Sequence, residues 1–232
     1  MGSGARSPGK YRHHESSYCA HWLDAEKKSL VASERREEER AAWREQVSHL
    51  DVNQFVFVDE CGSNIALTPL YARAPKGQRA YGSVPRNRGA NTTLLASLSL
   101  QGMGEAMILE GAADTLAFEV YIEQVLAPSL SAGQIVVMDN LSTHTGKKVR
   151  QALSARGCHL LFLPAYSPDL SPIEEAFSKL KAYLRRVGAR THEALEEAIG
   201  QALLTITAED ARGWFGHGGY TSAVQAGGQR NE

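Results

Sequence analysis

Two short runs of β-branched and aromatic residues, each ending in an aspartate, constrain the fold of this chain more than any other feature. The first is Gln54-Phe-Val-Phe-Val-Asp59, and the second is Gln134-Ile-Val-Val-Met-Asp139. Runs of this length and composition are typical of buried strands. We therefore expect two central strands that each carry an acid at the carboxyl end.

The segments around these two runs predict an α/β fold. Four strand-like pieces separated by Pro and Gly suggest an antiparallel meander: Tyr71–Ala74, Arg79–Val84, Asn91–Leu100 and Ala106–Leu109. A third buried strand is expected at 159–163, and helices at 114–126, 145–156, 171–187, 191–205 and 208–214. Since crossovers between parallel strands place helices on the sheet faces, we expect a mixed five-stranded sheet, an antiparallel hairpin plus parallel strands, flanked by helices. Ligand sites in such sheets gather at the carboxyl ends of the strands.

The ends of the chain differ in texture from this α/β domain, which we place at residues 51–220. Residues 1–20 are predicted to be a disordered or artificially added tail, and residues 221–232 a disordered C-terminal tail. Residues 21–50 are rich in Lys, Arg, Glu and Ala and predict a charged helical arm or linker. This arm is either solvated or lies on DNA or a partner subunit, and its few large apolar residues suggest that it becomes ordered only against such a partner.

Composition excludes several classes of protein. No apolar run approaches the roughly 20 residues of a membrane span, and the start of the chain lacks a secretory signal, so we expect a cytoplasmic protein with no membrane partner. Cys19, Cys61 and Cys158 are odd in number and scattered, which argues against a disulfide framework or a zinc knuckle. With a net charge of −1, a role on nucleic acid must rest on local basic patches.

Asp59 and Asp139 predict a metal site if they are neighbours. Carboxylates a few ångströms apart raise each other's pKa unless a cation lies between them. Oxygen ligands suit Mg²⁺ or Mn²⁺, and two such ions about 4 Å apart would stabilise an in-line phosphoryl displacement. The alternatives are a turn residue at the end of a strand for Asp59 and a side chain bonded to the following turn for Asp139.

A third acid, Glu174, has two interpretations. Ser171-Pro172-Ile173-Glu174 has the pattern of a capping box, in which the Glu174 carboxylate would return to the Ser171 amide. The same first turn could instead direct Glu174 beyond the helix start, toward the two aspartates. Glu175 is the rival acid, but Lys179 four residues on predicts a solvated ion pair for it.

These acids lie in motifs that resemble a known family. Phe57-Val-Asp-Glu60 before Gly62, Val137-Met-Asp-Asn-Leu-Ser-Thr-His144, the long motif from Leu163 to Lys181, and the ending Trp214–Tyr220 closely resemble the DDE transposases of the mariner superfamily. The similarity is strongest to its bacterial insertion-sequence branch, the IS-six-thirty type, whose spacing between the last two acids is the one found here. It covers residues 27–220, and the third motif is highly specific.

The resemblance implies an RNase H-like fold and metal-dependent DNA cleavage at transposon ends, followed by attack of the freed 3′-hydroxyl on target DNA. Asp59, Asp139 and Glu174 would be the catalytic ligands of two Mg²⁺ or Mn²⁺ ions. Asn140, His144 and Tyr166 would support the metal ligands from outside or touch the DNA, with Tyr166, Ser167 and Pro168 forming the loop that delivers Glu174. Phosphate contacts are expected from part of a basic set: Lys76, Arg79, Arg86, Arg88, Lys179, Lys181, Arg185, Arg186 and Arg190.

Two departures from the family pattern affect the expected partners. Ser171 stands where members commonly have Asn, a mild change because both are good N-caps. No helix-turn-helix precedes the core, so we interpret the chain as the catalytic part of a split or truncated transposase. It would act on transposon ends and target DNA at the bacterial nucleoid, as a homodimer or larger assembly, with a separate helix-turn-helix subunit as a candidate partner.

Three other functions stay open at this stage. The first is a different RNase H-like nuclease, cutting RNA–DNA hybrids or junctions. The second is a truncated or domesticated derivative that binds DNA or a partner without cutting. The third is a receiver-like phospho-acceptor domain that would use Asp59 with Glu60.

Overall fold

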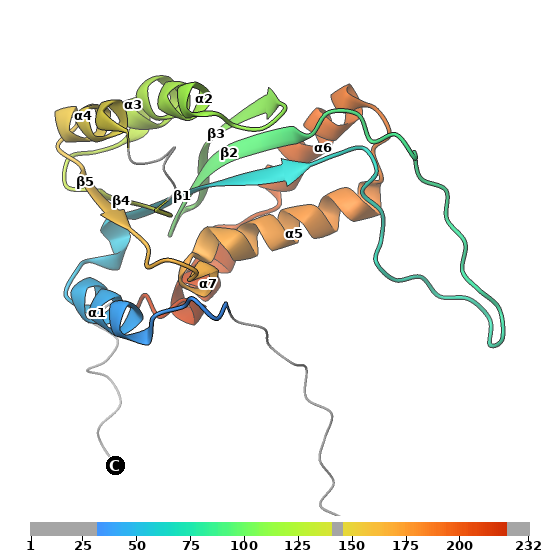
Figure 1. Ribbon diagram of the computed structural model, residues 1–232, viewed down its shortest axis with the longest axis horizontal. Helices are drawn as coiled ribbons and strands as arrows, with labels where there is room; N and C mark the ends of the chain where they lie inside the picture. The colour runs from blue at the N-terminus through green and yellow to red at the C-terminus, as the bar shows by residue number, and fades with distance from the viewer. Residues whose placement is uncertain (1–31, 141–145, 222–232) are drawn as a thin grey trace, which may run out of the picture. The chain divides into compact units, whose positions relative to one another are not determined.

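A mixed five-stranded sheet forms the centre of the part that the structure describes, residues 32–140 and 146–221 of this computed structural model (Figure 1). Its order is β3-β2-β1-β4-β5. The antiparallel strands are β1 (Phe55–Ser63), β2 (Thr92–Ser99) and β3 (Gly102–Glu110). On the other side of β1, β4 (Ile135–Met138) pairs with β1 in parallel, and β5 (His159–Phe162) pairs with β4 in parallel. The expected mixed sheet with a hairpin and parallel strands is confirmed.

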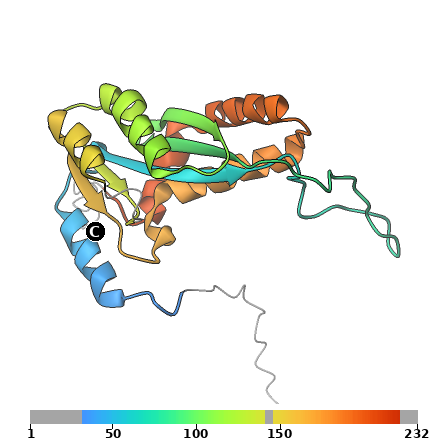
Figure 2. The same cartoon turned by 45° about the horizontal axis from the view of Figure 1, so that its top comes forward.

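Helices cover both faces of the sheet (Figures 1 and 2). One face carries α2 (Thr115–Val120), the π-helix η2 (Tyr121–Leu126), α3 (Ala127–Ser129) and α4 (Lys147–Ala155). The other face carries α5 (Pro172–Val187), α6 (His192–Leu204) and α7 (Ala208–His217). The remaining elements are α1 (Glu37–Ser48) and the 3₁₀ turns η1 (Val52–Gln54) and η3 (Pro168–Leu170).

Strand periodicity divides the core into two layers. Successive side chains of a strand point to opposite faces, so odd- and even-numbered residues of β1 and β4 separate. Phe55, Phe57, Ile135 and Val137 pack with α5, α6 and α7, whereas Val56, Val58, Val136 and Met138 pack with α2, η2 and α4. All eight side chains are 5% exposed or less.

Strand β1 is longer than the sequence indicates. It pairs with β4 only from Phe55 to Phe57 but continues beside β2 as far as Ser63. Asp59 therefore lies within β1 rather than at its end, which corrects the expectation. It follows the last parallel pair, Phe57 with Val137, at the point where β1 leaves β4. The sequence alone indicates an earlier end of the strand because Asp59 and Glu60 interrupt the apolar pattern. Backbone pairing with β2 does not require apolar side chains, so the strand continues.

The pieces Tyr71–Ala74 and Arg79–Val84 are not strands, which is a second correction. Residues 64–91 form instead a long connection between β1 and β2 that extends away from the sheet (Figure 1). Prolines at 69, 75 and 85 each remove a backbone donor, which disfavours strand pairing in this segment. We call residues 64–91 the basic arm, because it has no acidic residue and five basic ones: Arg73, Lys76, Arg79, Arg86 and Arg88.

The base of the basic arm is fixed by one arginine. The Arg190 guanidinium donates hydrogen bonds of 2.9 Å to the carbonyls of both Ile65 and Leu67. Farther out, the side chains of Tyr71 and Tyr81 are each 91% exposed. Arg190 therefore serves the protein's own backbone, a role that the sequence pattern did not indicate.

Helix α1 differs from the predicted solvated arm. Its helical state is confirmed over Glu37–Ser48, but one side is buried, with Arg40 1%, Trp43 5% and Val47 8% exposed. Residues at spacings of three and four form one face of a helix, so this set makes a narrow packing stripe despite the charged composition. Helix α1 is therefore ordered against its own chain. The earlier part of the predicted arm, residues 21–31, lies outside the described residues.

Other sequence expectations concern smaller features. Cys61 and Cys158 are buried and free, while Cys19 and the tails at 1–20 and 222–232 lie outside the described residues. No helix within 32–140 and 146–221 has the length and apolar character needed to cross a membrane.

Candidate active site

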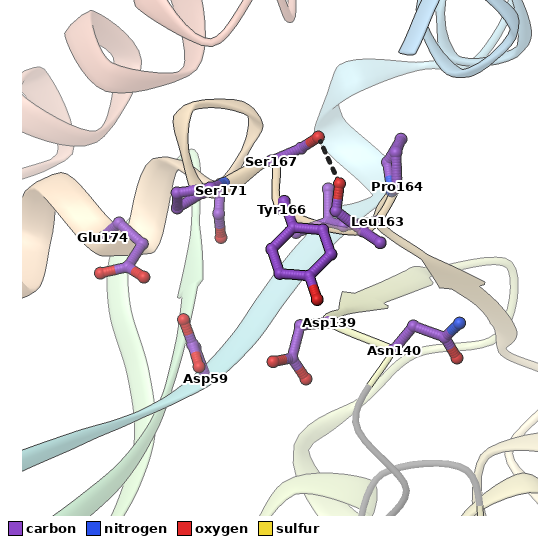
Figure 3. Close-up of a pocket in the computed structure, with 11 residues that line it drawn as sticks. Asp59, Asp139, Asn140, Leu163, Pro164, Tyr166, Ser167, Ser171 and Glu174 are labelled. Atoms are coloured by element: carbon purple, nitrogen blue, oxygen red, sulfur yellow. Dashed lines mark hydrogen bonds between the residues drawn. The ribbon is translucent and has the colours of Figure 1, made fainter. Parts of the chain in front are cut away.

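A cavity of about 410 Å³ opens where β1 separates from β4. Its walls come from β1, from the residues after β4 and β5, and from the start of α5 (Figure 3). The lining residues are Asp59, Asp139, Asn140, Leu163, Pro164, Ala165, Tyr166, Ser167, Pro168, Ser171 and Glu174. The three acids of the sequence motifs thus border the same cavity.

Residue parity explains why the acids meet on this side. Asp59 continues the odd-numbered face of β1, and Asp139 continues that of β4, so both lie on the face covered by α5. Glu174 is the third residue of α5 and approaches from the covering helix. In Figure 3, Glu174 and Asp59 point toward each other across the cavity, with Asp139 beside Asp59.

The start of α5 does not form the capping box that the sequence allowed. The Ser171 side chain makes no cap hydrogen bond, and the Ser171 amide donates to the Pro168 carbonyl at 2.9 Å. The amide that Glu174 would have used is therefore occupied by the preceding 3₁₀ turn. This geometry leaves the Glu174 carboxylate directed to the cavity, where Figure 3 places it.

The predicted ion pair between Glu175 and Lys179 is wrong. Glu175 contacts the imidazole of His217, and its carboxylate raises the pKa of that histidine. Lys179 instead donates to Asp210 at 2.6 Å. This bond, with further bonds from Thr207, lowers the pKa of Asp210 to about 2. Helix α7 packs beside α5 and supplies both partners, so tertiary contacts replaced the pair within the helix.

The loop before α5 presents a tyrosine in an unusual backbone conformation. Tyr166 has φ of 55°, and no other described residue apart from glycines has a positive φ. Such a left-handed residue costs roughly 1–2 kcal/mol. The Ser167 hydroxyl donates to the Ala165 carbonyl at 3.2 Å and so closes the turn. The Tyr166 ring is 57% exposed and extends over the cavity toward Asp139 (Figure 3).

The buried thiol of Cys61 lies near Lys181 and near two of the acids, Asp59 and Glu174. Burial raises the pKa of Cys61 to about 11, although the positive charge of Lys181 and hydrogen bonding to it oppose the rise. Glu174, Lys181 and Arg185 are spaced by seven and four residues and share one face of α5. Positive charge therefore continues along that face from the cavity.

The other predicted residues are placed separately. Asn140 borders the cavity, on the far side of Asp139 from Glu174 (Figure 3). Arg186 lies over the ring of Tyr183, 5.4 Å from its centroid, on a different side of α5 from Lys181. His144 lies outside the described residues.

The site offers the donor type that Mg²⁺ and Mn²⁺ prefer, because its acids supply only oxygen. Across residues 32–140 and 146–221, no three His, Cys, Asp or Glu side chains stand close enough to hold an ion as they are placed. Donor chemistry and common orientation therefore fit a divalent ion.

The cavity wall formed by Leu163, Pro164 and Ala165 was not predicted from the sequence. These residues follow β5, as Asp139 follows β4. The rule that ligand sites lie at carboxyl strand ends applies to the third buried strand as well and could have identified them.

Comparison with known proteins bears on this site. A family profile described as DDE superfamily endonuclease matches residues 54–197, a range that includes all three acids. The chain is 26% identical over 113 residues to the transposable element Tc1 transposase of Caenorhabditis elegans, covering 47% of this chain and 41% of that protein. It is also 26% identical over 163 residues to the Tcb2 transposase of Caenorhabditis briggsae, covering 65% and 60%. The chain thus spans about half the length of these relatives.

Solved structures share the fold. The Mos1 strand transfer complex aligns with a TM-score of 0.62 and 19% identity, covering 89% of this chain and 67% of that chain. Mos1 paired end complexes with Mn and with Mg align with TM-scores of 0.61 and 0.63, at 19% and 17% identity. They cover 89% and 100% of this chain, and 68% and 69% of those chains. The fold is RNase H-like, as the sequence resemblance implied.

Proposed function

We propose a function from one premise: this chain belongs to the DDE superfamily endonucleases. On that premise it is the catalytic domain of a transposase that cleaves DNA at transposon ends and joins the freed 3′-hydroxyl to target DNA. The observation that carries the proposal is the convergence of Asp59, Asp139 and Glu174 on one cavity. The transposase relatives favour this activity over that of another RNase H-like nuclease.

The three acids would hold two Mg²⁺ or Mn²⁺ ions. The Mos1 complexes solved with Mn or Mg support this choice of metal. When bound, such ions activate the attacking oxygen and stabilise the leaving oxygen of a phosphoryl displacement. Asp59 and Asp139 would provide ligands from the sheet, and Glu174 would provide one from the covering helix.

Other residues of the chain would bind and orient the DNA. Lys181 and Arg185 continue from Glu174 along one face of α5, so they would contact phosphates of the strand that enters the cavity. Tyr166 extends over the cavity and would limit where that strand can lie. Asn140 borders the cavity and would contact the DNA or support the metal ligands, and motif position suggests the same role for His144. Lys179 is paired with the Asp210 carboxylate, and Arg186 lies on a different side of α5, so both would contribute less.

The finer identity belongs to the same proposal. The motif spacing supports the bacterial insertion-sequence branch of the mariner superfamily. The catalytic domain would comprise residues 51–220. A transposase of this branch would act at the nucleoid. Two transposon ends require two active sites, which supports a homodimer or larger assembly. The paired end complexes of Mos1 are consistent with that assembly, and a separate helix-turn-helix subunit would supply recognition of the ends.

Nicking of supercoiled plasmid DNA by the purified full chain in Mn²⁺ tests the proposed chemistry. Glu174→Gln should reduce nicking by at least about a hundredfold while leaving Tm nearly unchanged, because the carboxylate makes the metal site but no capping box. Glu175→Gln is the matched control and should stay within about twofold. Ca²⁺ in place of Mn²⁺ should permit binding without turnover.

The opposite ranking of the two glutamates would identify Glu175 as the ligand. Nicking that persists in excess chelator would exclude the metal-dependent mechanism. A second assay separates transposition from simple hydrolysis, by offering a labelled duplex with a free 3′-hydroxyl together with target plasmid. Covalent joining that is lost with a 3′-deoxy end supports strand transfer, whereas nicking without joining supports another nuclease.

A further inference from the structure

An ion pair between a buried arginine and a half-exposed aspartate connects α1 to the loop that lines the candidate active site. Arg40 is 1% exposed, and its guanidinium donates two parallel hydrogen bonds to Asp169, of 2.9 Å to Oδ1 and 2.5 Å to Oδ2. Asp169 lies between Pro168 and Leu170 in η3, and Pro168 borders the cavity. Helix α1 therefore contacts the back of the segment whose front is the wall of the site.

A second contact joins the same two elements. The Trp43 indole N–H donates to the Tyr220 hydroxyl at 3.1 Å, and that hydroxyl donates to the Leu170 carbonyl at 2.6 Å. Burial raises the pKa of Tyr220, so the phenol remains a donor at any physiological pH. Two residues of α1, one helical turn apart, thus fix two consecutive residues of η3.

The turn held in this way sets the position of Glu174. The amides of Leu170, Ser171 and Glu174 donate in succession to the carbonyls of Ser167, Pro168 and Ser171, at 3.0, 2.9 and 3.1 Å. Each bond ties one residue to the residue three before it. A shift of Asp169 would therefore pass into the first turn of α5 and into the loop that holds Tyr166.

The chemistry of Arg40 argues for positioning over net stability. Desolvating a buried guanidinium offsets most of its attraction to a carboxylate, and an apolar side chain often stabilises a protein as well. Arg40 retains a further cost, because its Nε has no hydrogen-bond partner although Glu37 Oε2 lies 3.5 Å away. A bidentate Arg–carboxylate pair does supply a fixed geometry.

We propose that Arg40 and Asp169 are positioning residues for the reaction proposed above, holding the 165–171 loop so that Tyr166 and Glu174 face Asp139 and Asp59. The inference rests on the proposed function for its effect on DNA cleavage, but not for its effect on the loop. Helix α1 thereby belongs to the active site's supporting structure. Movement of α1 would change the site without touching any acid.

Amide hydrogen exchange tests the loop directly, without any activity. In Arg40→Met, the amides of Leu170, Ser171 and Glu174 should exchange at least about tenfold faster, because the turn loses its anchor, while β4 amides keep their rates. The control is Arg44→Met, which removes the same charge from the exposed side of α1 and should leave all rates unchanged. Uniform acceleration in Arg40→Met, or none, would overturn the proposal.

Kinetics of the full chain test the consequence for cleavage. Arg40→Met should lower kcat at least about tenfold with KM for plasmid DNA unchanged, and should raise the half-saturating Mn²⁺ concentration several-fold, since Glu174 is no longer held. Activity that falls only in proportion to the unfolded fraction would show a structural role and refute positioning. If Arg40→Met does not fold, Asp169→Asn, altered at a side chain that is 52% exposed, should give the same pattern.

The hydrogen-exchange and kinetic experiments separate the positioning role from the proposed function on which it rests. Faster exchange confined to 170–174 in a wild-type protein that never nicks DNA would support the positioning of the loop and refute the nuclease. Normal nicking with unchanged exchange in Arg40→Met and Asp169→Asn would support the nuclease and refute the positioning of the loop.

Discussion

The two faces of the central sheet are built from the same strands yet present different chemistry. Asp59 follows Val58 and Asp139 follows Met138, so each acid adjoins a buried apolar residue that points the other way. On the α2–α4 face, Val56, Val58, Val136 and Met138 are apolar and closely packed. On the α5 face, Asp59 and Asp139 follow the apolar residues Phe57 and Val137, and the cavity begins there.

The residues that support chemistry and those that support stability thus lie on opposite faces of the sheet. β1 and β4 stop pairing after Phe57 and Val137. The next odd-numbered residues, Asp59 and Asp139, are therefore no longer paired with each other and can face a cavity. On the α2–α4 face, the even-numbered residues Val58 and Met138 stay buried against the helices. One face should therefore respond to substitution in activity, and the other in stability.

The largest expected effect is on the α5 face. Asp139→Asn should reduce DNA nicking by about a thousandfold or more, because an amide is a poor ligand for Mg²⁺ and carries no charge. Its Tm should not fall, since the substitution removes repulsion between neighbouring carboxylates. Plasmid nicking and calorimetry on the same sample provide the measurement. A large drop in Tm together with partial activity would mean that Asp139 is a structural residue.

The second prediction concerns the neighbouring residue on the opposite face. Met138→Ala should lower the free energy of unfolding by about 2–4 kcal/mol, because a fully buried side chain leaves a cavity. Nicking per folded molecule should stay within about fivefold of wild type at a temperature where the variant is folded. Urea unfolding measures the first quantity. A thousandfold loss of activity would break the distinction between the faces.

The third prediction divides the surface of α5. Lys181→Gln should weaken binding to duplex DNA about three- to tenfold at low salt and reduce the salt dependence by about one phosphate contact. Arg186→Gln should have a smaller effect, because Arg186 lies over Tyr183 on another side of the helix. Fluorescence anisotropy across a salt series compares them. Equal effects would indicate that charge alone, and not the face near Glu174, attracts the DNA.

The smallest expected effect comes from the contact between Glu175 and His217. Since the carboxylate raises the pKa of His217, the pair stabilises the folded protein below about pH 6.5, and this contribution is lost as pH rises through the higher folded-state value. The difference in Tm between wild type and His217→Gln should therefore be larger at pH 6 than at pH 9. The reverse trend would show that the histidine is held without its charge.

Much of this comparison could be predicted from the sequence. Alternation in Phe55–Val58 and Ile135–Met138 identifies two buried strands, and parity then orients the acid that follows each. The antiparallel hairpin and the parallel orientation of β4 and β5 relative to β1 also follow from apolar runs and turn residues. The RNase H-like arrangement was implied by motifs whose residues lie on three separate elements.

The parts that sequence could not predict depend on contacts between distant segments. Nothing near Lys179 indicates that Asp210 would outcompete Glu175, because the two helices meet only in the folded chain. Arg40 looked solvated among neighbouring charges until Asp169 was placed beside it. The end of β1 was misjudged for the same reason, since β2 decides how far the strand extends.

The basic arm has a consequence for how such proteins can change. It leaves the sheet after Ser63 and returns at Thr92, and these two residues face each other in the antiparallel register of β1 and β2. A segment that departs and returns at paired positions can be lengthened, shortened or exchanged without shifting either strand. The arm is thus a separable module, and evolution or a protein engineer could alter what it touches while every acid of the cavity keeps its place.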